Sequence, residues 1–334
     1  MGRLKMLAAM AACAGALSLL ACGKDSGGGS GGGGSASGDV VIGIVAKSQD
    51  NPVFQAAHKG AQDAADELSK STGKHIVIKI LTPPKESPTE QADAIDSLVR
   101  SGAQGIAVSC TEAGAVLEPI NKAVDKGVAV MCFDSDCPQS KRLCYYGTDD
   151  EKCGTLVMQK LAAEMGDKGV IAILAGTESA PNLRRRVDAA RAELKKHPGI
   201  TEIASGAVYH KENAAEAAQA LQDTQRAHKE ITGWALVGGW PLFTKDALPW
   251  KPGEVKVVSV DALPAQLGYI SSGHVNLLLA QDCYGWGHKS VEILVAKIVN
   301  KKDPSDKIII DPLKEITKTN VDTWAESWKN WLPK

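Results

Sequence analysis

The sequence is poor in aromatic residues and carries almost no net charge. Phe, Trp and Tyr make up 4% of its 334 residues, and 38 basic residues stand against 39 acidic ones. A surface that binds nucleic acid needs a clear excess of Lys and Arg. We therefore expect no nucleic-acid partner.

Several short motifs that carry chemistry are missing as well. The chain has no G-x-x-x-x-G-K phosphate loop and no G-x-S-x-G nucleophile turn. No two cysteines have C-x-x-C spacing, and no His stands at zinc-finger distance from them, so we expect no metal site. The sequence predicts a protein that is not an enzyme and needs no cofactor.

Long apolar runs are absent beyond the amino terminus, where Met6 to Ala21 is uncharged and follows Arg3 and Lys5. This run is too short to span a bilayer comfortably and is typical of a secretory signal. Its end, Leu-Leu-Ala-Cys at Cys22, resembles the bacterial lipobox, which implies cleavage before Cys22 and a lipid on its thiol. An ordinary signal peptide followed by a chance cysteine is the alternative.

The segment after Cys22 is rich in Gly and Ser and cannot bury a core, so it is predicted to be a flexible tether. We expect a lipoprotein signal peptide at 1–21 and the lipid anchor with its tether at 22–38. The mature protein would then be periplasmic or otherwise extracytoplasmic, held to the membrane by the lipid.

Six cysteines follow the tether: Cys110, Cys132, Cys137, Cys144, Cys153 and Cys283. An even number in an exported chain permits disulfides. Cys137 and Cys144 flank a polar loop, which makes them the best candidate pair. The other four are expected to be buried thiols.

Strand and helix patterns alternate after the tether. Short β-branched runs predict strands, and apolar residues three and four apart predict helices between them. The predicted strands are 40–46, 76–81, 105–109, 129–133, 169–174, 201–208, 233–237, 255–260 and 307–310. Strict alternation indicates right-handed βαβ units and parallel sheets covered on both faces.

The pattern restarts near residue 150, which predicts two similar sheet lobes. We expect the chain to cross between them near Asp149, Asp282 and Asp311. The first lobe would contain 40–149 and 283–310, and the second 150–282 and 311–334. A stripe of Trp324, Trp328 and Trp331 predicts a final helix packed on its own lobe, with membrane contact as the alternative.

Fixed polar groups follow almost every predicted strand. In an open parallel sheet such positions meet at one edge, where ligands bind. The candidate ligand-binding residues are Lys47, Asn51, Phe54, Ser109, Asp134, Ser135, Asn182, Arg186, Trp240, Asp261 and Gln281. Carboxylates accept from hydroxyls, Lys and Arg donate to ring oxygens, and aromatic faces cover C–H groups. The set predicts a neutral polyol ligand.

Each candidate also has a purely structural explanation. Asp134 and Asp261 could cap helices, Phe54 could belong to the core, and Trp240 could plug a loop. Arg186 ends a run of three arginines, of which only one can point inward. The prediction therefore depends on the co-occurrence of these residues.

Five segments resemble, in family order, the periplasmic sugar-binding proteins of the ribose-binding type. They are IGIVAKSQDNPVFQAAHKGAQDAADEL, VAVMCFDSD, NLRRRVDAARAEL, VVSVDA and LLAQDCYGWGHKSVEIL, and the likeness runs from about Val40 to Thr319. The resemblance implies an α/β fold of the type I periplasmic binding proteins. This fold has two Rossmann-like lobes with parallel sheets, joined by a three-strand hinge, which close over a sugar.

The resemblance also assigns roles to individual residues. It implies that the following residues contact the sugar: Asn51 and Phe54 in the first loop, the carboxylates Asp134 and Asp261, Arg186, and Gln281 at the hinge. Lys47 replaces a small polar residue of the family, Ser135 stands where ribose binders carry Arg, and Trp240 stands where an Asn is expected. These departures argue against ribose itself.

As a function, the resemblance implies a monomeric lipoprotein receptor of an ABC importer, with a monosaccharide ligand and the permease subunits as partners. The alternative is a sensory subunit that presents a sugar or an autoinducer-2-like ligand to a membrane kinase or chemoreceptor. A glycosidase that uses Asp134 and Asp261 as acid and base is the enzymatic rival.

Overall fold

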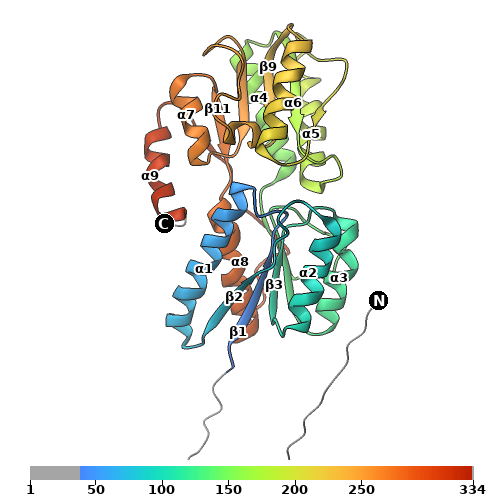
Figure 1. Ribbon diagram of the computed structural model, residues 1–334, viewed down its shortest axis with the longest axis vertical. Coiled ribbons are helices and arrows are strands. Elements are labelled where there is room, and N and C mark those ends of the chain that lie inside the picture. The colour runs from blue at the N-terminus through green and yellow to red at the C-terminus, as the bar shows by residue number, and fades with distance from the viewer. Residues whose placement is uncertain (1–37, 333–334) are drawn as a thin grey trace, which may run out of the picture. The chain divides into compact units, whose positions relative to one another are not determined.

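Two β-sheets organise residues 38–332, the part of the chain that this computed structural model describes (Figure 1). The predicted signal peptide, the predicted lipid position Cys22 and nearly all of the predicted tether lie outside that part. Between residues 38 and 332, no helix combines the length and the apolarity that spanning a bilayer requires. The predicted α/β architecture with two parallel-sheet lobes is confirmed.

The first sheet has six strands, and every neighbouring pair in it is parallel. Its order is β12 (Ile308–Ile310), β5 (Tyr145–Gly147), β4 (Ala129–Phe133), β3 (Gly105–Val108), β1 (Val40–Val45) and β2 (Ile76–Ile80). Helices α1 (Pro52–Thr72) and α8 (Cys283–Asn300) cover one face, and α2 (Pro88–Arg100) and α3 (Ala113–Asp125) cover the other. We call this group the first lobe.

Local sequence signals set the ends of these elements. Asn51 caps α1 by accepting a hydrogen bond from the Val53 N–H, and Pro52 takes the first helical position, where its missing N–H costs nothing. Helices α1 and α8 pack closely because Gly287 has no side chain. A Cβ atom at that position would collide with the Ala57 carbonyl.

The second sheet has the same order of connections. It runs β13 (Lys314–Ile316), β11 (Leu277–Ala280), β10 (Lys256–Val260), β9 (Ile231–Leu236), β6 (Gly169–Ala175) and β7 (Ile200–Glu202), and β8 (Val208–Tyr209) also pairs with β6. Only the β11–β13 pair is antiparallel. Helices α4 (Asp150–Met165) and α5 (Pro181–Leu194) cover one face. The other face carries α6 (Ala214–Ala227), the 3-10 turn η1 (Trp240–Phe243), α7 (Pro264–Ser272) and α9 (Val321–Trp331). We call this group the second lobe.

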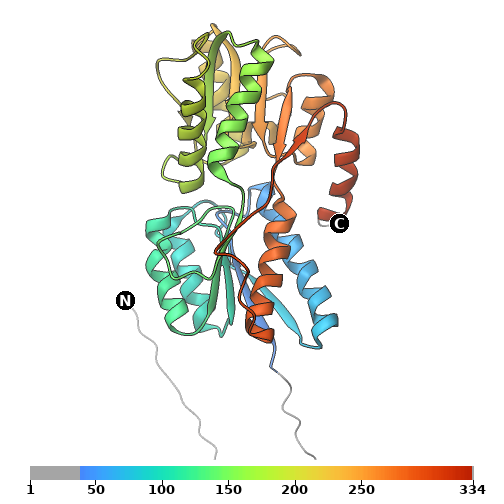
Figure 2. The same ribbon diagram turned by 180° about the vertical axis from the view of Figure 1, so that it is seen from behind.

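The chain crosses between the lobes three times, after β5, β11 and β12, as Figure 2 shows from behind. The crossings are tied to one another. The Thr148 hydroxyl donates to Gln281 Oε1 at 2.8 Å, and the Asp311 N–H donates to the Gly147 carbonyl at 2.8 Å. These bonds hold the three crossing segments side by side.

Five short strands differ from the sequence expectation. The single strand predicted at 201–208 is two short strands, β7 and β8, and the predicted strands do not include β5, β11 or β13. Strands of two or three residues are too short to show a period of two along the sequence.

The final helix α9 packs on the second lobe, as the tryptophan stripe predicts. The indole N–H groups of Trp324 and Trp328 both donate to the Ala262 carbonyl, at 2.7 and 2.8 Å, and Trp328 is buried. Trp331 stacks on Tyr284 of α8 with ring centroids 5.9 Å apart, so the end of α9 also contacts the first lobe.

The expected disulfide between Cys137 and Cys144 is corrected by the structure. All six described cysteines are free thiols. Both cysteines lie in the connection between β4 and β5, yet their side chains belong to different core clusters. Cys144 packs with Met131 and Phe133 on the α1 and α8 face, whereas Cys137 packs on the α2 and α3 face. The sheet separates them.

Candidate functional site

Side chains from both lobes enclose a cavity at the carboxyl ends of the two sheets. Its volume is about 20 Å³, which is room for a single water molecule. It is lined by Lys47, Asn51, Val53, Phe54, Asp134, Asn182, Leu183, Arg186, Glu212, Gly238, Trp240, Asp261, Gln281 and Trp286. We call this the interlobe cavity.

Lys47 reaches the cavity from the end of β1 and is 1% exposed. Its ammonium donates to Asn182 Oδ1 at 3.2 Å and lies 3.3 Å from Glu212 Oε1, both from the second lobe. Burial would lower the pKa of Lys47, but Glu212, Asp134 and Glu86 together raise it above its ordinary value. Burial raises the pKa of Glu212. The pair joins the lobes across the cavity.

Two aspartates occupy matching positions in the two lobes. Asp134 follows β4 and Asp261 follows β10, which stand third in their respective sheets. Both have left-handed backbone, with φ of 55° and 69°. This conformation turns each side chain away from the strand direction at the sheet edge, and Asp tolerates it better than most residues. Neither aspartate caps a helix.

Both aspartates are held by hydrogen bonds. Asp134 Oδ2 accepts from the Ser109 hydroxyl at 2.6 Å. Asp261 accepts from the Gly239 N–H at 3.1 Å and from Gln281 Nε2 at 2.7 Å. Burial raises the pKa of Asp261, although the Gln281 amide and the charge of Arg186 oppose this rise.

Arg186 is the inward member of the arginine run. It is 2% exposed, whereas Arg184 is exposed and Arg185 is half-buried. Its guanidinium donates to Asp150 Oδ1 at 2.9 Å, to the Val237 carbonyl at 3.1 Å and to Gln281 Oε1 at 2.7 Å. Arg186 therefore lines the cavity and also anchors α5 to the start of α4.

Aromatic side chains cover the cavity from both lobes. Phe54 and Trp286 come from α1 and α8, with ring centroids 6.3 Å apart, and Trp240 comes from η1. Trp286 is 1% exposed, and its indole N–H has no hydrogen-bond partner. An unpaired buried donor is costly, so this group is suited to a ligand acceptor.

Nine of the eleven candidate residues line the interlobe cavity. Ser109 does not line the cavity, but its hydroxyl donates to Asp134, which does. Ser135 is buried, and its hydroxyl makes no hydrogen bond. The sequence analysis missed Glu212 and Trp286. Glu212 lies three residues past the two-residue strand β8, which the sequence analysis joins with β7 into one strand. Trp286 lies six residues past the end of β11, inside the segment LLAQDCYGWG.

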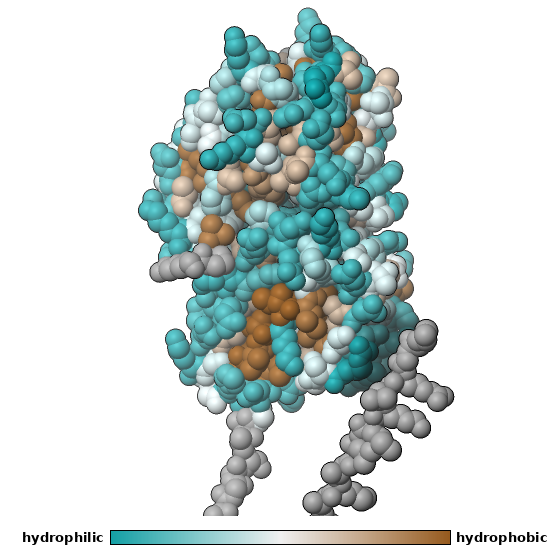
Figure 3. Space-filling model, in the orientation of Figure 1, coloured by the Kyte–Doolittle hydropathy of each residue, from teal (hydrophilic) through white to brown (hydrophobic). Residues whose placement is uncertain are grey.

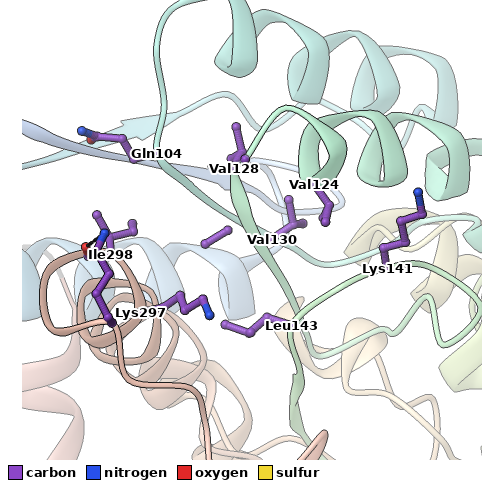
Figure 4. A pocket seen from close by; sticks show the side chains of 11 residues that line it. Gln104, Val124, Val128, Val130, Lys141, Leu143, Lys297 and Ile298 are labelled. Atoms are coloured by element: carbon purple, nitrogen blue, oxygen red, sulfur yellow. Dashed lines mark hydrogen bonds between the residues drawn. The ribbon is translucent and has the colours of Figure 1, made fainter.

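A larger cavity lies elsewhere. It has a volume of about 640 Å³ and lies at the amino ends of β3 and β4, between the ends of α3 and α8 (Figure 4). Its lining is largely aliphatic, with Val130 and Leu143 in Figure 4 between Lys141 and Ile298. Lys141 already pairs with Asp125 at 2.6 Å. Its polar lining residues, Gln104 and three lysines, already bond to other groups of the chain, and no carboxylate lines it, unlike the interlobe cavity.

The exposed surface of the first lobe carries an apolar patch. Figure 3 shows apolar side chains gathered on the first lobe between α1 and α2, where Ile80 and Leu81 are 41% and 40% exposed at the edge strand β2. Within residues 38–332, no group of three His, Cys, Asp or Glu side chains could hold a metal ion. The interlobe cavity is thus the candidate site.

The sequence of this chain matches a known protein family. The model of the periplasmic binding protein domain matches residues 42–302. A xylose/arabinose-binding protein from Sulfolobus acidocaldarius is 23% identical over 257 residues, which are 70% of this chain and 60% of the relative. A ribose import binding protein from Haemophilus influenzae is 24% identical over 48% of this chain and 53% of its own length. The chain thus spans between half and two thirds of the length of these relatives.

Solved structures agree in fold. An ABC transporter solute-binding protein from Burkholderia graminis, in complex with D-arabinose, is 26% identical with a TM-score of 0.75 over 84% of this chain and 96% of that one. A chain of the XylFII–LytSN complex is 24% identical with a TM-score of 0.72 over 84% of this chain and 98% of that one.

Proposed function

The chain belongs to the periplasmic binding protein family, and from this premise we propose that it captures a monosaccharide in the interlobe cavity. Members of the family bind solutes outside the cytoplasm and are not enzymes. One observation carries the proposal: the carboxylates of two aspartates, an arginine, a lysine and three amide side chains converge between aromatic faces. A neutral polyol needs this mixture of acceptors, donors and flat apolar surface.

The hydrogen bonds across the cavity suggest how a ligand is accommodated. In the structure the polar groups satisfy one another, through the bonds of Lys47 to Glu212 and Asn182, of Ser109 to Asp134, and of Gln281 to Asp261. A cavity of about 20 Å³ does not hold a sugar. We propose that the lobes separate to admit it and that sugar hydroxyls then replace some of these mutual bonds.

We propose a role for each part of the site. Asp134 and Asp261 accept hydrogen bonds from sugar hydroxyls, one from each lobe. The Asn51 amide group donates from the first lobe, since its oxygen already caps α1. The Trp286 N–H donates to a sugar oxygen, while Phe54 and Trp240 cover the C–H faces of the ring.

We propose that the lobes move as two rigid bodies, 40–149 with 283–310 and 150–282 with 311–334. The three crossing segments would absorb the change in backbone angles, and the sugar would favour the closed population. The partner would be the permease of an ABC importer. Lipid on Cys22 would keep the monomeric receptor at the membrane, with residues 22–38 as its tether.

A sensory role is the second candidate, favoured by the likeness to the XylFII chain of the XylFII–LytSN complex. In that role the closed, sugar-bound receptor would dock on another protein instead of a permease. The site and its ligand would be unchanged. Deleting the permease genes of the host separates the roles, because only an importer receptor depends on them for sugar uptake.

A thermal-shift screen of the mature protein tests the binding proposal. Pentoses, hexoses and deoxyhexoses are compared with amino acids as unrelated small solutes. A ligand that binds only the folded protein raises its unfolding temperature by mass action, and we expect this for one or a few sugars. A rise with amino acids alone would overturn the sugar assignment, as would the same rise in an Asp134→Asn variant.

A further inference from the structure

A second pocket lies beside the interlobe cavity and also has walls from both lobes. Its volume is about 310 Å³, and small-molecule sites have volumes of roughly 300–1,000 Å³. Asp50, Glu86 and Thr111 line it from the first lobe, and Thr177 and Glu212 are among the residues that line it from the second. Glu212 also lines the interlobe cavity, so the two spaces adjoin at its side chain. We call this second space the side pocket.

The lining of the side pocket is almost entirely polar. Of its eleven residues only Pro88 has an apolar side chain, and none is aromatic. Four are acidic and two, Lys85 and Lys211, are basic, and one of the acidic residues already pairs with Lys47. This balance does not favour an anion such as phosphate, and no flat apolar surface is offered to an aromatic group. The lining suits a neutral group rich in hydroxyls, because carboxylates accept, lysines donate and hydroxyl side chains do both.

Thr111 contributes a hydroxyl that lacks a partner. The residue is 2% exposed, and its Oγ1 makes no hydrogen bond within residues 38–332. Its backbone is fixed, because the Thr111 N–H donates at 3.0 Å to Oε1 of Gln91, which is itself buried. A buried hydroxyl without a partner is unfavourable, so a hydrogen bond with a ligand in the side pocket would stabilise it.

Glu86 contributes a second unpaired atom at the boundary between the lobes. Its Oε2 accepts a hydrogen bond at 2.7 Å from the hydroxyl of Thr177, which belongs to the second lobe. Its Oε1 is buried and has no partner in the described part of the chain. A ligand hydroxyl that donates to Oε1 would therefore bind next to a contact that forms only while the lobes are together.

The two spaces differ in what they can hold while the lobes are together. The interlobe cavity has a volume of about 20 Å³, whereas the side pocket has about 310 Å³ in the same arrangement of the lobes. A monosaccharide in the interlobe cavity would leave the side pocket to water. A second unit attached to that sugar has room there when the lobes close.

We propose that the side pocket binds a second sugar unit, so that the preferred ligand is a disaccharide. This inference rests on the proposed sugar-binding function, whose monosaccharide becomes the unit held in the interlobe cavity. Hydroxyls of the second unit contact Thr111 and Glu86, and the bond between the units passes beside Glu212. Lys211 and Glu216 line the side pocket at exposed positions, so this side of the pocket is open to solvent.

Calorimetry with matched sugars tests the proposal on the full-length chain. Xylose, arabinose, glucose and galactose are each compared with their α- and β-linked disaccharides. We expect at least one disaccharide to bind about 10-fold more tightly than its monosaccharide, because two buried polar atoms gain partners. Binding of monosaccharides alone, or equal affinities throughout, overturns this inference and leaves the proposed function standing. Binding of no sugar at all overturns both.

A Thr111→Val variant tests where the second unit lies. Valine keeps the shape of the side chain and removes an Oγ1 that makes no hydrogen bond, so the unfolding temperature without sugar should not fall. The affinity for the disaccharide should fall about 3- to 10-fold, which reduces its advantage over the monosaccharide. Thr201→Val, at an exposed position of β7 outside both spaces, is the matched control and should keep the wild-type ratio of affinities. A wild-type ratio in Thr111→Val overturns the placement of a second unit in the side pocket.

Discussion

The Lys47 ammonium and the Glu212 carboxylate lie 3.3 Å apart, although one belongs to the first lobe and the other to the second. Their side chains are 1% and 4% exposed. Such a pair exists only while the lobes are together, because separation returns both charges to water. In the opening that we propose, this ion pair contributes to the balance between the open and closed forms before any ligand arrives.

Replacing Lys47 with Met should shift the ligand-free protein toward the open form. The variant leaves Glu212 buried without its partner, and opening the lobes relieves that cost by hydrating the carboxylate. Small-angle X-ray scattering should show a larger radius of gyration than in the wild type. Lys70→Met, a change at an exposed position of α1, is the control and should leave the radius unchanged. Equal radii in all three proteins would contradict this prediction.

Asp134→Asn should weaken sugar binding about 10- to 100-fold, since one acceptor of a buried hydroxyl is lost at roughly 1–3 kcal/mol. Asn also accepts the left-handed backbone at φ 55°, so the unfolding temperature without ligand should change little. Calorimetry with the sugar found by thermal shift measures the affinity. Ser135→Ala, next in sequence but outside the cavity, should bind normally. Unaltered binding by Asp134→Asn would remove this residue from the site.

Trp286→Phe should reduce affinity about 3- to 10-fold, because the ring remains but its N–H donor is lost. The matched control is Trp250→Phe, since the Trp250 N–H is also buried without a partner but does not face the interlobe cavity. Calorimetry compares the two variants. Equal affinities would mean that the Trp286 N–H does not contact the ligand.

Arg186→Ala should destabilise the fold as well as the site. It leaves Asp150 buried beside only the half-buried Arg185, and breaking a buried ion pair in this way costs about 3–5 kcal/mol. Arg184→Ala, at the exposed position two residues earlier, should change the unfolding free energy by less than about 0.5 kcal/mol. Urea denaturation measures both. A fully stable Arg186→Ala protein would show that its bond to Asp150 is dispensable.

Acid should destabilise the protein through His58. Burial lowers the pKa of His58 to about 4, from an ordinary value near 6.5. Between pH 4 and 6.5, His58 binds a proton in the unfolded chain but not in the folded protein. The free energy of unfolding that His58 contributes above pH 6.5 is therefore lost as the pH falls toward 4. The loss attributable to His58 is up to about 3 kcal/mol.

Replacement of His58 tests this assignment. The ring nitrogen Nε2 lies 3.2 Å from Thr82 Oγ1, an arrangement that Gln can imitate. His58→Gln should therefore flatten the decline in urea stability between pH 6.5 and 4. His75→Gln, at an exposed histidine, should keep the wild-type slope. A wild-type slope in His58→Gln would refute the role of this residue.

The sequence predicts the sheets and most of the cavity because both follow from strand ends. The composition of long β-branched runs such as β1 and β6 predicts strands. The residue after each run then lies at the edge of the sheet where the carboxyl ends of parallel strands meet. Lys47, Asp134 and Asp261 are found in this way. Glu212 is not, because it follows a two-residue strand in an irregular stretch, and only the folded chain brings it to Lys47.

The sequence also does not predict which side chains contact one another in the folded chain. Each arginine of the run Arg184–Arg186 has the same chemistry, and the phase of the helix decides which one is buried at the cavity. The cysteines give a similar lesson. Cys137 and Cys144 are close in sequence, yet they pack in different core clusters on opposite faces of the first sheet.

The left-handed backbone at Asp134 and Asp261 restricts how this protein can evolve. Most single amino-acid replacements at either position would have to adopt a conformation that only Asn and Gly tolerate nearly as well as Asp. Few replacements at the two aspartates can therefore change which ligand is bound. More replacements are compatible with the backbone at Lys47, Trp240 and Glu212, where φ is not positive. The pair of aspartates would persist while the residues around them diverge.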